Sequence, residues 1–162
     1  MSLRWHQNFL RQCLVIAELS KDRRTQVGAI LTTWETPPAV LSTGFNGLAR
    51  GIADTSVRLN EREVKLKLIV HAERNAILNA ARMGIATNNS LLYVAGRNVV
   101  TGDIYGQWCC SACAIELIQA GVKKIVWPAF SSPSHWETDT RLSHSLLEEA
   151  GIITETVSFA KL

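Results

Sequence analysis

The sequence contains no long apolar run. Charged residues interrupt its N-terminal segment at Arg4, Glu18 and Lys21, so the pattern of a signal peptide is missing, and no stretch approaches the length of a membrane span. Internal repeats and low-complexity tracts are missing too. These absences predict a cytoplasmic globular protein with no membrane partner. The length of 162 residues predicts a single domain over residues 1–162.

A strong charge of either sign is also missing. The chain has 17 Lys and Arg residues against 14 Asp and Glu residues, which gives a formal net charge of +3 and a pI of about 8.8. A mild positive excess suits an anionic small molecule, whereas nucleic-acid binding usually needs a concentrated basic surface. We therefore expect a small-molecule partner and do not expect a nucleic acid.

Cysteine is scarce and unevenly placed. Of the four cysteines, Cys109, Cys110 and Cys113 lie within five consecutive positions, and Cys13 stands alone in an apolar stripe with helical spacing. A disulfide framework would spread its cysteines along the chain, because cross-links must join distant segments. The cluster therefore indicates a metal or redox site, and Cys13 is expected in the core.

The hydrophobic pattern changes repeatedly between helical and strand spacing. It predicts helices over residues 3–20, 61–69, 71–83, 110–120 and 136–150, strands over 27–34, 39–45, 91–95, 124–127 and 152–157, and loops over 46–60, 96–108 and 128–135. The first two strands form a hairpin, and later strands alternate with helices. This order predicts an α/β fold, a three-layer α/β/α sandwich around a mixed sheet of roughly five strands. Crossovers in such a fold bring the starts of the helices at 71 and 110 together, at the carboxyl ends of neighbouring strands.

Four residues at these two helix starts form a candidate site. Cys110 and Cys113 share one helix face, and the N-terminus of a helix favours their thiolate form. Together with His71 they offer one imidazole and two thiolates, which suit Zn²⁺ and leave a fourth position for water, as in catalytic zinc sites. Glu73 begins the same helix as His71 and can accept and return a proton. His-x-Glu followed by Cys-x-x-Cys is the signature of zinc deaminases.

The cysteine pair is also compatible with a redox site or a structural zinc site. A redox pair would normally follow an early strand, and a structural zinc site needs a fourth ligand, whereas the side chain of Cys109 should point away from the face shared by Cys110 and Cys113. We therefore favour catalytic zinc. A redox protein and a non-catalytic, zinc-stabilised binding module are the alternatives.

Two segments, His71–Ile77 and Cys110–Ala114, resemble the zinc motifs of the cytidine/deoxycytidylate deaminase superfamily. Residues 20–29 and 44–51 resemble loops of its deoxycytidylate deaminase branch. The resemblance implies a cytidine deaminase-like fold, Zn²⁺ held by the imidazole and the two thiolates, and Glu73 as the proton shuttle. It also implies hydrolytic deamination of a cytosine nucleotide, with dCMP as the leading substrate, and a homo-oligomer.

The same resemblance implies substrate contacts. The main-chain N–H of Ala72 would hold the pyrimidine carbonyl, and Asn46 would bind the sugar or the base. The phosphate would lie near the loop that contains Ser20, Lys21, Arg23 and Arg24. The alternative for these cationic residues is a solvated turn, and the alternative for Asn46 is a turn residue with left-handed backbone geometry.

Cys109 replaces a proline that is customary before the Cys-x-x-Cys motif, which should not affect zinc binding. Two other departures concern the expected pocket: Arg97 to Trp108 form an insertion, and Ala49 replaces another customary proline. These departures leave open a deaminase of another base, such as guanine, a free or modified base, or adenosine in tRNA. Trp108, His135 and Trp136 flank loops that could close over a base, although such tryptophans more often lie in a core or an interface.

Overall fold

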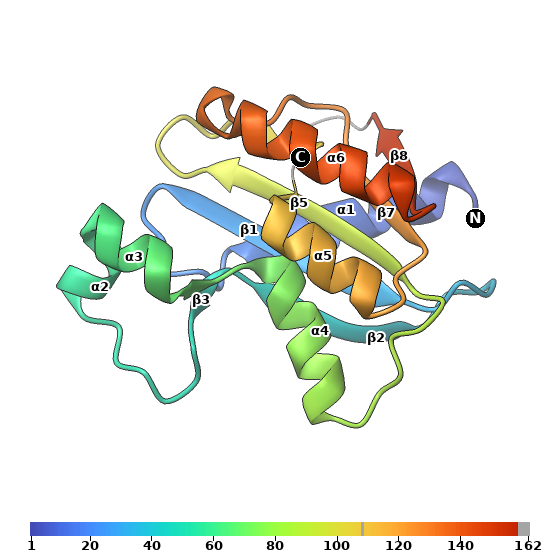
Figure 1. Cartoon of the computed structure of the whole chain (residues 1–162), viewed down its shortest axis with the longest axis horizontal. Helices are drawn as coiled ribbons and strands as arrows, with labels where there is room; N and C mark the ends of the chain where they lie inside the picture. Colours follow the sequence, from blue (N-terminus) through green and yellow to red (C-terminus); the bar gives the residue numbers. More distant parts are fainter. Residues whose placement is uncertain (108, 159–162) are drawn as a thin grey trace.

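The computed structural model describes residues 1–107 and 109–158, so the hypothesis for Trp108 falls outside the described residues. One sheet organises the fold (Figure 1). Its strand order is β2 (Val40–Phe45), β1 (Thr25–Thr32), β5 (Leu91–Asn98), β7 (Lys124–Pro128) and β8 (Ile153–Val157), and the short β6 (Ile104–Tyr105) also pairs with β5. The pairs formed by β1 are antiparallel, whereas β5, β7 and β8 run parallel. The predicted mixed sheet is confirmed.

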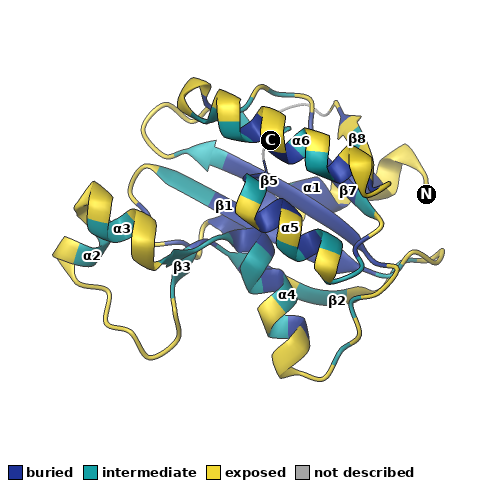
Figure 2. Cartoon of the chain, viewed as in Figure 1, coloured by how far each residue is buried: buried dark blue, intermediate teal, exposed yellow. Residues whose placement is uncertain are grey.

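Helices cover both faces of this sheet. Helix α1 (Leu3–Ala17) packs on one face, and α4 (Ala72–Arg82), α5 (Ser111–Gln119) and α6 (Glu137–Glu149) lie on the other (Figure 1). Side chains of the central strands alternate between two cores, because successive strand residues point to opposite faces. Ile30 belongs to the α1 core, whereas its neighbours Ala29 and Leu31 belong to the core beneath α4, α5 and α6. Figure 2 shows the buried strands between the helices, so the predicted three-layer arrangement is confirmed.

Two glycines allow helices to touch the sheet directly. A Cβ atom on Gly28 would lie 2.0 Å from the carbonyl oxygen of Cys13 in α1. A Cβ atom on Gly44 would lie 2.3 Å from the carbonyl oxygen of Ala72 and 2.4 Å from the nitrogen of Ala76 in α4. None of these three distances accommodates a side chain, so Gly28 and Gly44 set how closely α1 and α4 approach the strands.

Three predicted loops contain regular structure. Residues 46–60 include β3 (Gly47–Leu48) and α2 (Ser56–Asn60), and β3 pairs with β4 (Ile69–Val70). The predicted helix at 61–69 is confirmed as α3 (Arg62–Leu68). Residues 96–108 include the end of β5 and its hairpin partner β6, and a 3₁₀ helix, η1 (Ser134–Trp136), precedes α6. The loop predictions were wrong there because β3 and β6 are defined by pairing with another strand, while α2 and η1 are too short to show hydrophobic periodicity.

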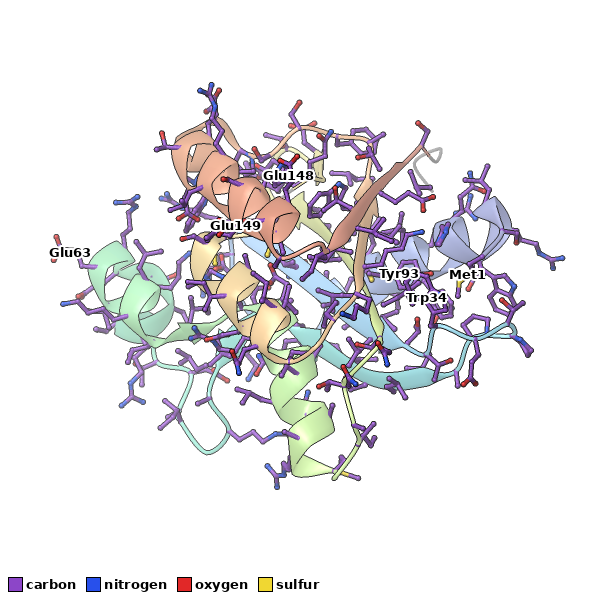
Figure 3. All side chains as sticks on the ribbon, turned by 45° about the vertical axis from the view of Figure 1, so that its right-hand side comes forward. Met1, Trp34, Glu63, Tyr93, Glu148 and Glu149 are labelled. Atoms are coloured by element: carbon purple, nitrogen blue, oxygen red, sulfur yellow. The ribbon has the colours of Figure 1, made fainter. Side chains whose placement is uncertain are left out.

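A polar cluster lies beneath α1. Met1 lies beside Tyr93 (Figure 3), whose hydroxyl is 3.1 Å from the sulfur of Met1 and 2.9 Å from Nδ1 of the buried His6. The thiol of Cys13 donates to the carbonyl of Tyr93 at 3.4 Å and is fully buried, which confirms the predicted core position.

No helix among residues 1–107 and 109–158 combines the length and the apolar character needed to cross a membrane.

Candidate active site

The candidate site lies at the sheet edge where β2 and β5 end and β1 begins. Helix α4 starts at this edge after β4, and α5 starts there after β6. The two helix starts are therefore close together, as predicted. The strands involved are not neighbours, however, because β1 lies between β2 and β5.

Three side chains converge between these helix starts. His71 precedes the first residue of α4 and Cys110 precedes the first residue of α5, while Cys113 lies one turn into α5. Nδ1 of His71 is 3.2 Å from Sγ of Cys110 and 3.4 Å from Sγ of Cys113, and the three atoms lie within 4.8 Å of one another. Sulfur and nitrogen ligands of one tetrahedral Zn²⁺ would stand about 3.5 Å apart, given typical bond lengths. The three donors therefore fit a single soft divalent cation.

No fourth His, Cys, Asp or Glu joins this group within the described part of the chain. Cys109 is fully buried, and its Sγ is directed to the carbonyl oxygen of Cys110 at 3.6 Å. Three protein ligands with an open fourth position are the arrangement of a catalytic zinc site, whereas a structural site has four.

Local hydrogen bonds make one of the two cysteines acidic. The thiol of Cys113, together with His71, stabilises the Cys110 thiolate and lowers the pKa of Cys110 to about 4. The same hydrogen bond to Cys110, together with burial, raises the pKa of Cys113. The hydrogen bond with Cys110 raises the pKa of His71 to about 9. A bound cation would displace protons from Cys113 and His71, because only the deprotonated forms bind metal.

Glu73 lies in the first turn of α4, two residues after His71. The residue is only 5% exposed and lines the same pocket as His71 and Cys110. Burial raises the pKa of Glu73 to about 7. A carboxyl group with such a pKa can both accept and deliver a proton near neutral pH, which is the requirement for general acid–base catalysis.

Asp139 of α6 supports the start of α5. One carboxylate oxygen accepts from the main-chain N–H of Ser111 at 3.0 Å, and the other accepts from the Ser111 hydroxyl at 2.6 Å. Ser111 lies between the two cysteine positions, so Asp139 holds the turn that carries both thiols. Sequence reasoning missed this residue, because no spacing relates the start of α6 to the cysteine motif.

A pocket of about 770 Å³ extends outward from these residues. Most of its wall comes from four places: the α1–β1 loop with the start of β1, helices α2 and α3, the β5–β6 hairpin, and η1 with the start of α6. The hairpin formed by the insertion contributes Asn98 and Tyr105. Trp136 meets the ring of His71 edge-on, with centroids 6.3 Å apart, and His135 also lines the pocket.

Two of the residues expected to contact the substrate lie in the pocket wall. Ala72 and Asn46 line the pocket. The amide of Asn46 also braces β1, because its Oδ1 accepts from the N–H of Val27 at 2.8 Å and its Nδ2 donates to the carbonyl of Thr25 at 2.9 Å. The left-handed residues other than glycine are Asn89 and Gln107 among those described, so Asn46 is not a left-handed turn residue.

The residues of the cationic loop fall into two groups, one in the pocket wall and one outside it. Arg23 and Arg24 line the pocket. Ser20 is buried and its hydroxyl accepts from the N–H of Asp22 at 3.2 Å, while Lys21 pairs with Asp54. Neither Ser20 nor Lys21 contributes to the pocket wall. Sequence reasoning missed Arg62 of α3, which also lines the pocket.

Known proteins share this architecture and these motifs. Residues 3–129 match the family described as the cytidine and deoxycytidylate deaminase zinc-binding region. An uncharacterized deaminase from Aliivibrio fischeri is 31% identical over 155 residues, which cover 94% of this chain and 92% of that protein. Human deoxycytidylate deaminase is 28% identical over 150 residues, which cover 90% of this chain and 74% of that enzyme.

A solved structure supports the fold. The dCMP deaminase of cyanophage S-TIM5, crystallised with dCMP and dUMP, superimposes with a TM-score of 0.75 at 21% identity, covering 97% of this chain and 99% of that one. The family match spans both zinc motifs and most of the sheet. The chain therefore belongs to the cytidine and deoxycytidylate deaminase family.

Proposed function

We propose that this protein is a zinc-dependent hydrolytic deaminase that converts dCMP to dUMP and ammonia. The observation that carries the proposal is the convergence of His71, Cys110 and Cys113 at a pocket that the buried Glu73 also lines. Relatives named deoxycytidylate deaminase, including the human and mouse proteins, support the choice of substrate. So does the S-TIM5 enzyme, whose structure contains dCMP and dUMP.

His71, Cys110 and Cys113 would hold the zinc ion. When bound, zinc lowers the pKa of a water molecule and thereby supplies a nucleophile at neutral pH. Glu73, Cys110 and Cys113 are buried, and electrostatic interactions between such shielded groups are stronger than between solvated ones.

Glu73 then moves the proton. Its carboxylate accepts a proton from the attacking water as the water oxygen bonds to C4 of the cytosine ring, and it delivers that proton to ring N3. A second proton passes from the new hydroxyl through Glu73 to the amino group. The C4–N bond breaks, ammonia leaves, and the keto group of uracil remains. Ala72 lines the pocket beside Glu73, and its main-chain N–H, at the first residue of α4, would hold the ring carbonyl.

The test is ammonia release from a substrate panel, with the metal content measured on the same sample. The panel contains dCMP, CMP, dCTP, deoxycytidine, cytosine, guanine and adenosine. We expect dCMP to give the highest kcat/KM and one zinc ion per chain. Deamination of guanine or adenosine in preference to every cytosine compound would contradict the proposal.

A Glu73→Gln variant separates the proton shuttle from metal binding. Glutamine keeps the size of the side chain but cannot carry the proton, so we expect kcat to fall by about 10²- to 10⁴-fold while zinc content stays unchanged. Substantial activity in a zinc-loaded Glu73→Gln preparation would refute the assigned role.

A further inference from the structure

The insertion between β5 and the cysteine motif forms a hairpin that holds one aromatic side chain in the pocket wall. Strand β6 pairs antiparallel with the end of β5, with Tyr105 opposite Gly96. The side chain of Asn98 closes the turn, because its Oδ1 accepts from the N–H groups of Val100 and Thr101 at 2.9 and 3.2 Å. Its Nδ2 donates to the hydroxyl of Tyr105 at 3.0 Å.

The hairpin is also fastened to the rest of the molecule on two sides. On one side, the N–H of Val99 donates to the carbonyl of Arg24 at 2.8 Å. On the other side, Gly106 lies directly against the end of β7, where a Cβ atom on it would be only 1.9 Å from the carbonyl oxygen of Pro128. These backbone contacts fix the position of the strand that carries Tyr105.

Tyr105 stands between two cavities. It lines the pocket that contains His71 and Glu73, and it also lines a second cavity of about 580 Å³ between the hairpin and residues 130–135. Asn98 and His135 are the other two residues that line both cavities. Tyr105 carries the largest of these three side chains, so its ring forms much of the boundary between the substrate pocket and the second cavity.

The proposed reaction orients the pyrimidine ring within the pocket. The C2 carbonyl lies toward the N–H of Ala72, N3 lies toward Glu73, and C4 lies at the metal ligands. N1 carries the sugar and points toward the loop at residues 20–24, where the phosphate is expected. In a six-membered ring C5 and C6 lie opposite C2 and N3, so the C5–C6 edge faces away from the start of α4.

Aromatic side chains lead from the metal ligands to the boundary between the cavities. The ring of Trp136 meets the ring of His71 edge-on, with centroids 6.3 Å apart, and its centroid is 6.0 Å from that of His135. His135 shares the boundary with Tyr105. Because C5 is bonded to C4 and lies on the edge away from α4, it faces this aromatic wall.

We propose that Tyr105 is a specificity-determining residue for the C5 position of the base: its ring closes the substrate pocket toward the second cavity and limits the size of the substituent on C5. The proposal rests on the proposed function, because it concerns the same substrate in the same pocket. A packed wall of this kind discriminates about 10- to 200-fold against one additional carbon group. The limit comes from the insertion, which the zinc motifs do not include.

Tyr105→Ala is the direct test, with dUMP and 5-propynyl-dUMP as the two ligands and calorimetry as the measurement. The parent should bind dUMP at least about tenfold more tightly than 5-propynyl-dUMP, because the rigid propynyl group meets the Tyr105 ring. Tyr105→Ala opens a path to the second cavity, so the two affinities should differ by less than about threefold. The same change is expected in the ratio of kcat/KM for dCMP and 5-propynyl-dCMP.

Two matched variants separate the ring of Tyr105 from other effects. Tyr105→Phe removes the hydroxyl but keeps the ring, so it should keep the parent ratio of affinities. Ile104→Ala shortens the neighbouring side chain of β6, which lines the second cavity but not the substrate pocket, and it should keep that ratio as well. Tyr105→Leu retains apolar bulk in the hairpin and should shift the ratio in the same direction as Tyr105→Ala, which provides a second test if the alanine variant is unstable.

Several results would overturn the inference. They are a parent that binds dUMP and 5-propynyl-dUMP equally, Tyr105→Ala and Tyr105→Leu variants that keep the parent ratio, and a Tyr105→Phe or Ile104→Ala variant that changes the ratio as much as Tyr105→Ala. Binding does not require turnover, so a parent that selects dUMP over 5-propynyl-dUMP but releases no ammonia from dCMP would contradict the proposed function alone. A parent that binds neither ligand would contradict both proposals.

Discussion

Replacing Gly44 by alanine should damage the catalytic site, because Gly44 packs against the backbone of α4, the helix that carries Glu73. The new Cβ atom would lie 2.3 Å from the carbonyl oxygen of Ala72 and 2.4 Å from the nitrogen of Ala76, whereas ordinary contacts begin at 3.4 Å. These neighbours are backbone atoms, so no side-chain rotation relieves the clash and the start of α4 must move away by about 1 Å. Overpacking of this kind lowers the free energy of unfolding by about 1–3 kcal/mol, which corresponds to a fall in Tm of roughly 2–12 °C for a chain of this size.

The movement matters because His71 and Glu73 flank Ala72. A displacement of about 1 Å between catalytic groups can reduce the rate about 100-fold. We therefore expect Gly44→Ala to lose activity well beyond its loss of stability, as measured by ammonia release below its Tm, with zinc content determined in parallel.

Gly47→Ala provides the control. A Cβ atom there would meet only the Phe45 side chain, at 3.5 Å, and the backbone at Gly47 is not left-handed. This variant should keep a Tm within about 2 °C of the parent and near-normal activity. If Gly44→Ala is as stable and as active as Gly47→Ala, the argument that close backbone contact sets the position of α4 is refuted.

Two further variants test the metal site. Cys113→Ala removes one of three ligands, so the purified protein should contain little zinc and should gain no thermal stability from added zinc, whereas the parent should gain it by preferential binding to the folded state. Equal zinc content in the two proteins would contradict the assignment of Cys113. Asp139→Ala removes both acceptors of Ser111, so zinc affinity measured by competition with a chelator should fall by about 10- to 100-fold, as for other groups that orient metal ligands. Unchanged affinity would show that the start of α5 holds its shape without Asp139.

The sheet and its helices could be predicted because their residues carry strong periodic patterns. Strand β5 is a continuous apolar run flanked by turns, and α4 and α5 are rich in alanine and end at glycines with positive φ. The short elements could not be predicted, because β3, β4 and β6 contain two residues each. They are defined only by strand pairing, β3 with β4 and β6 with β5. Pairing of this kind leaves no periodic trace in a single sequence.

The candidate metal site could be proposed from sequence because its chemistry restricts residue type and spacing. Imidazole and thiolate groups are common ligands of zinc, and the N-terminus of a helix stabilises the negative charge of a thiolate. The substrate wall is different, since lining residues such as Arg62, Asn98 and Asp139 are common polar types that any surface might carry. Only the folded structure shows that these residues line a pocket and do not belong to an ordinary solvated surface. For the same reason Ser20 and Lys21 looked equivalent to Arg23 and Arg24 in the sequence but lie outside the pocket wall.

The wall contributed by η1 and α6 lies beyond the part of the chain that matches the family. The match ends at residue 129, yet Trp136, Asp139 and Leu142 line the pocket that also contains Glu73. The reacting groups and part of the wall around the substrate therefore come from separate stretches of the chain. A substitution after residue 129 can change the shape of this cavity while both zinc motifs stay intact, so the motifs alone do not describe the whole pocket.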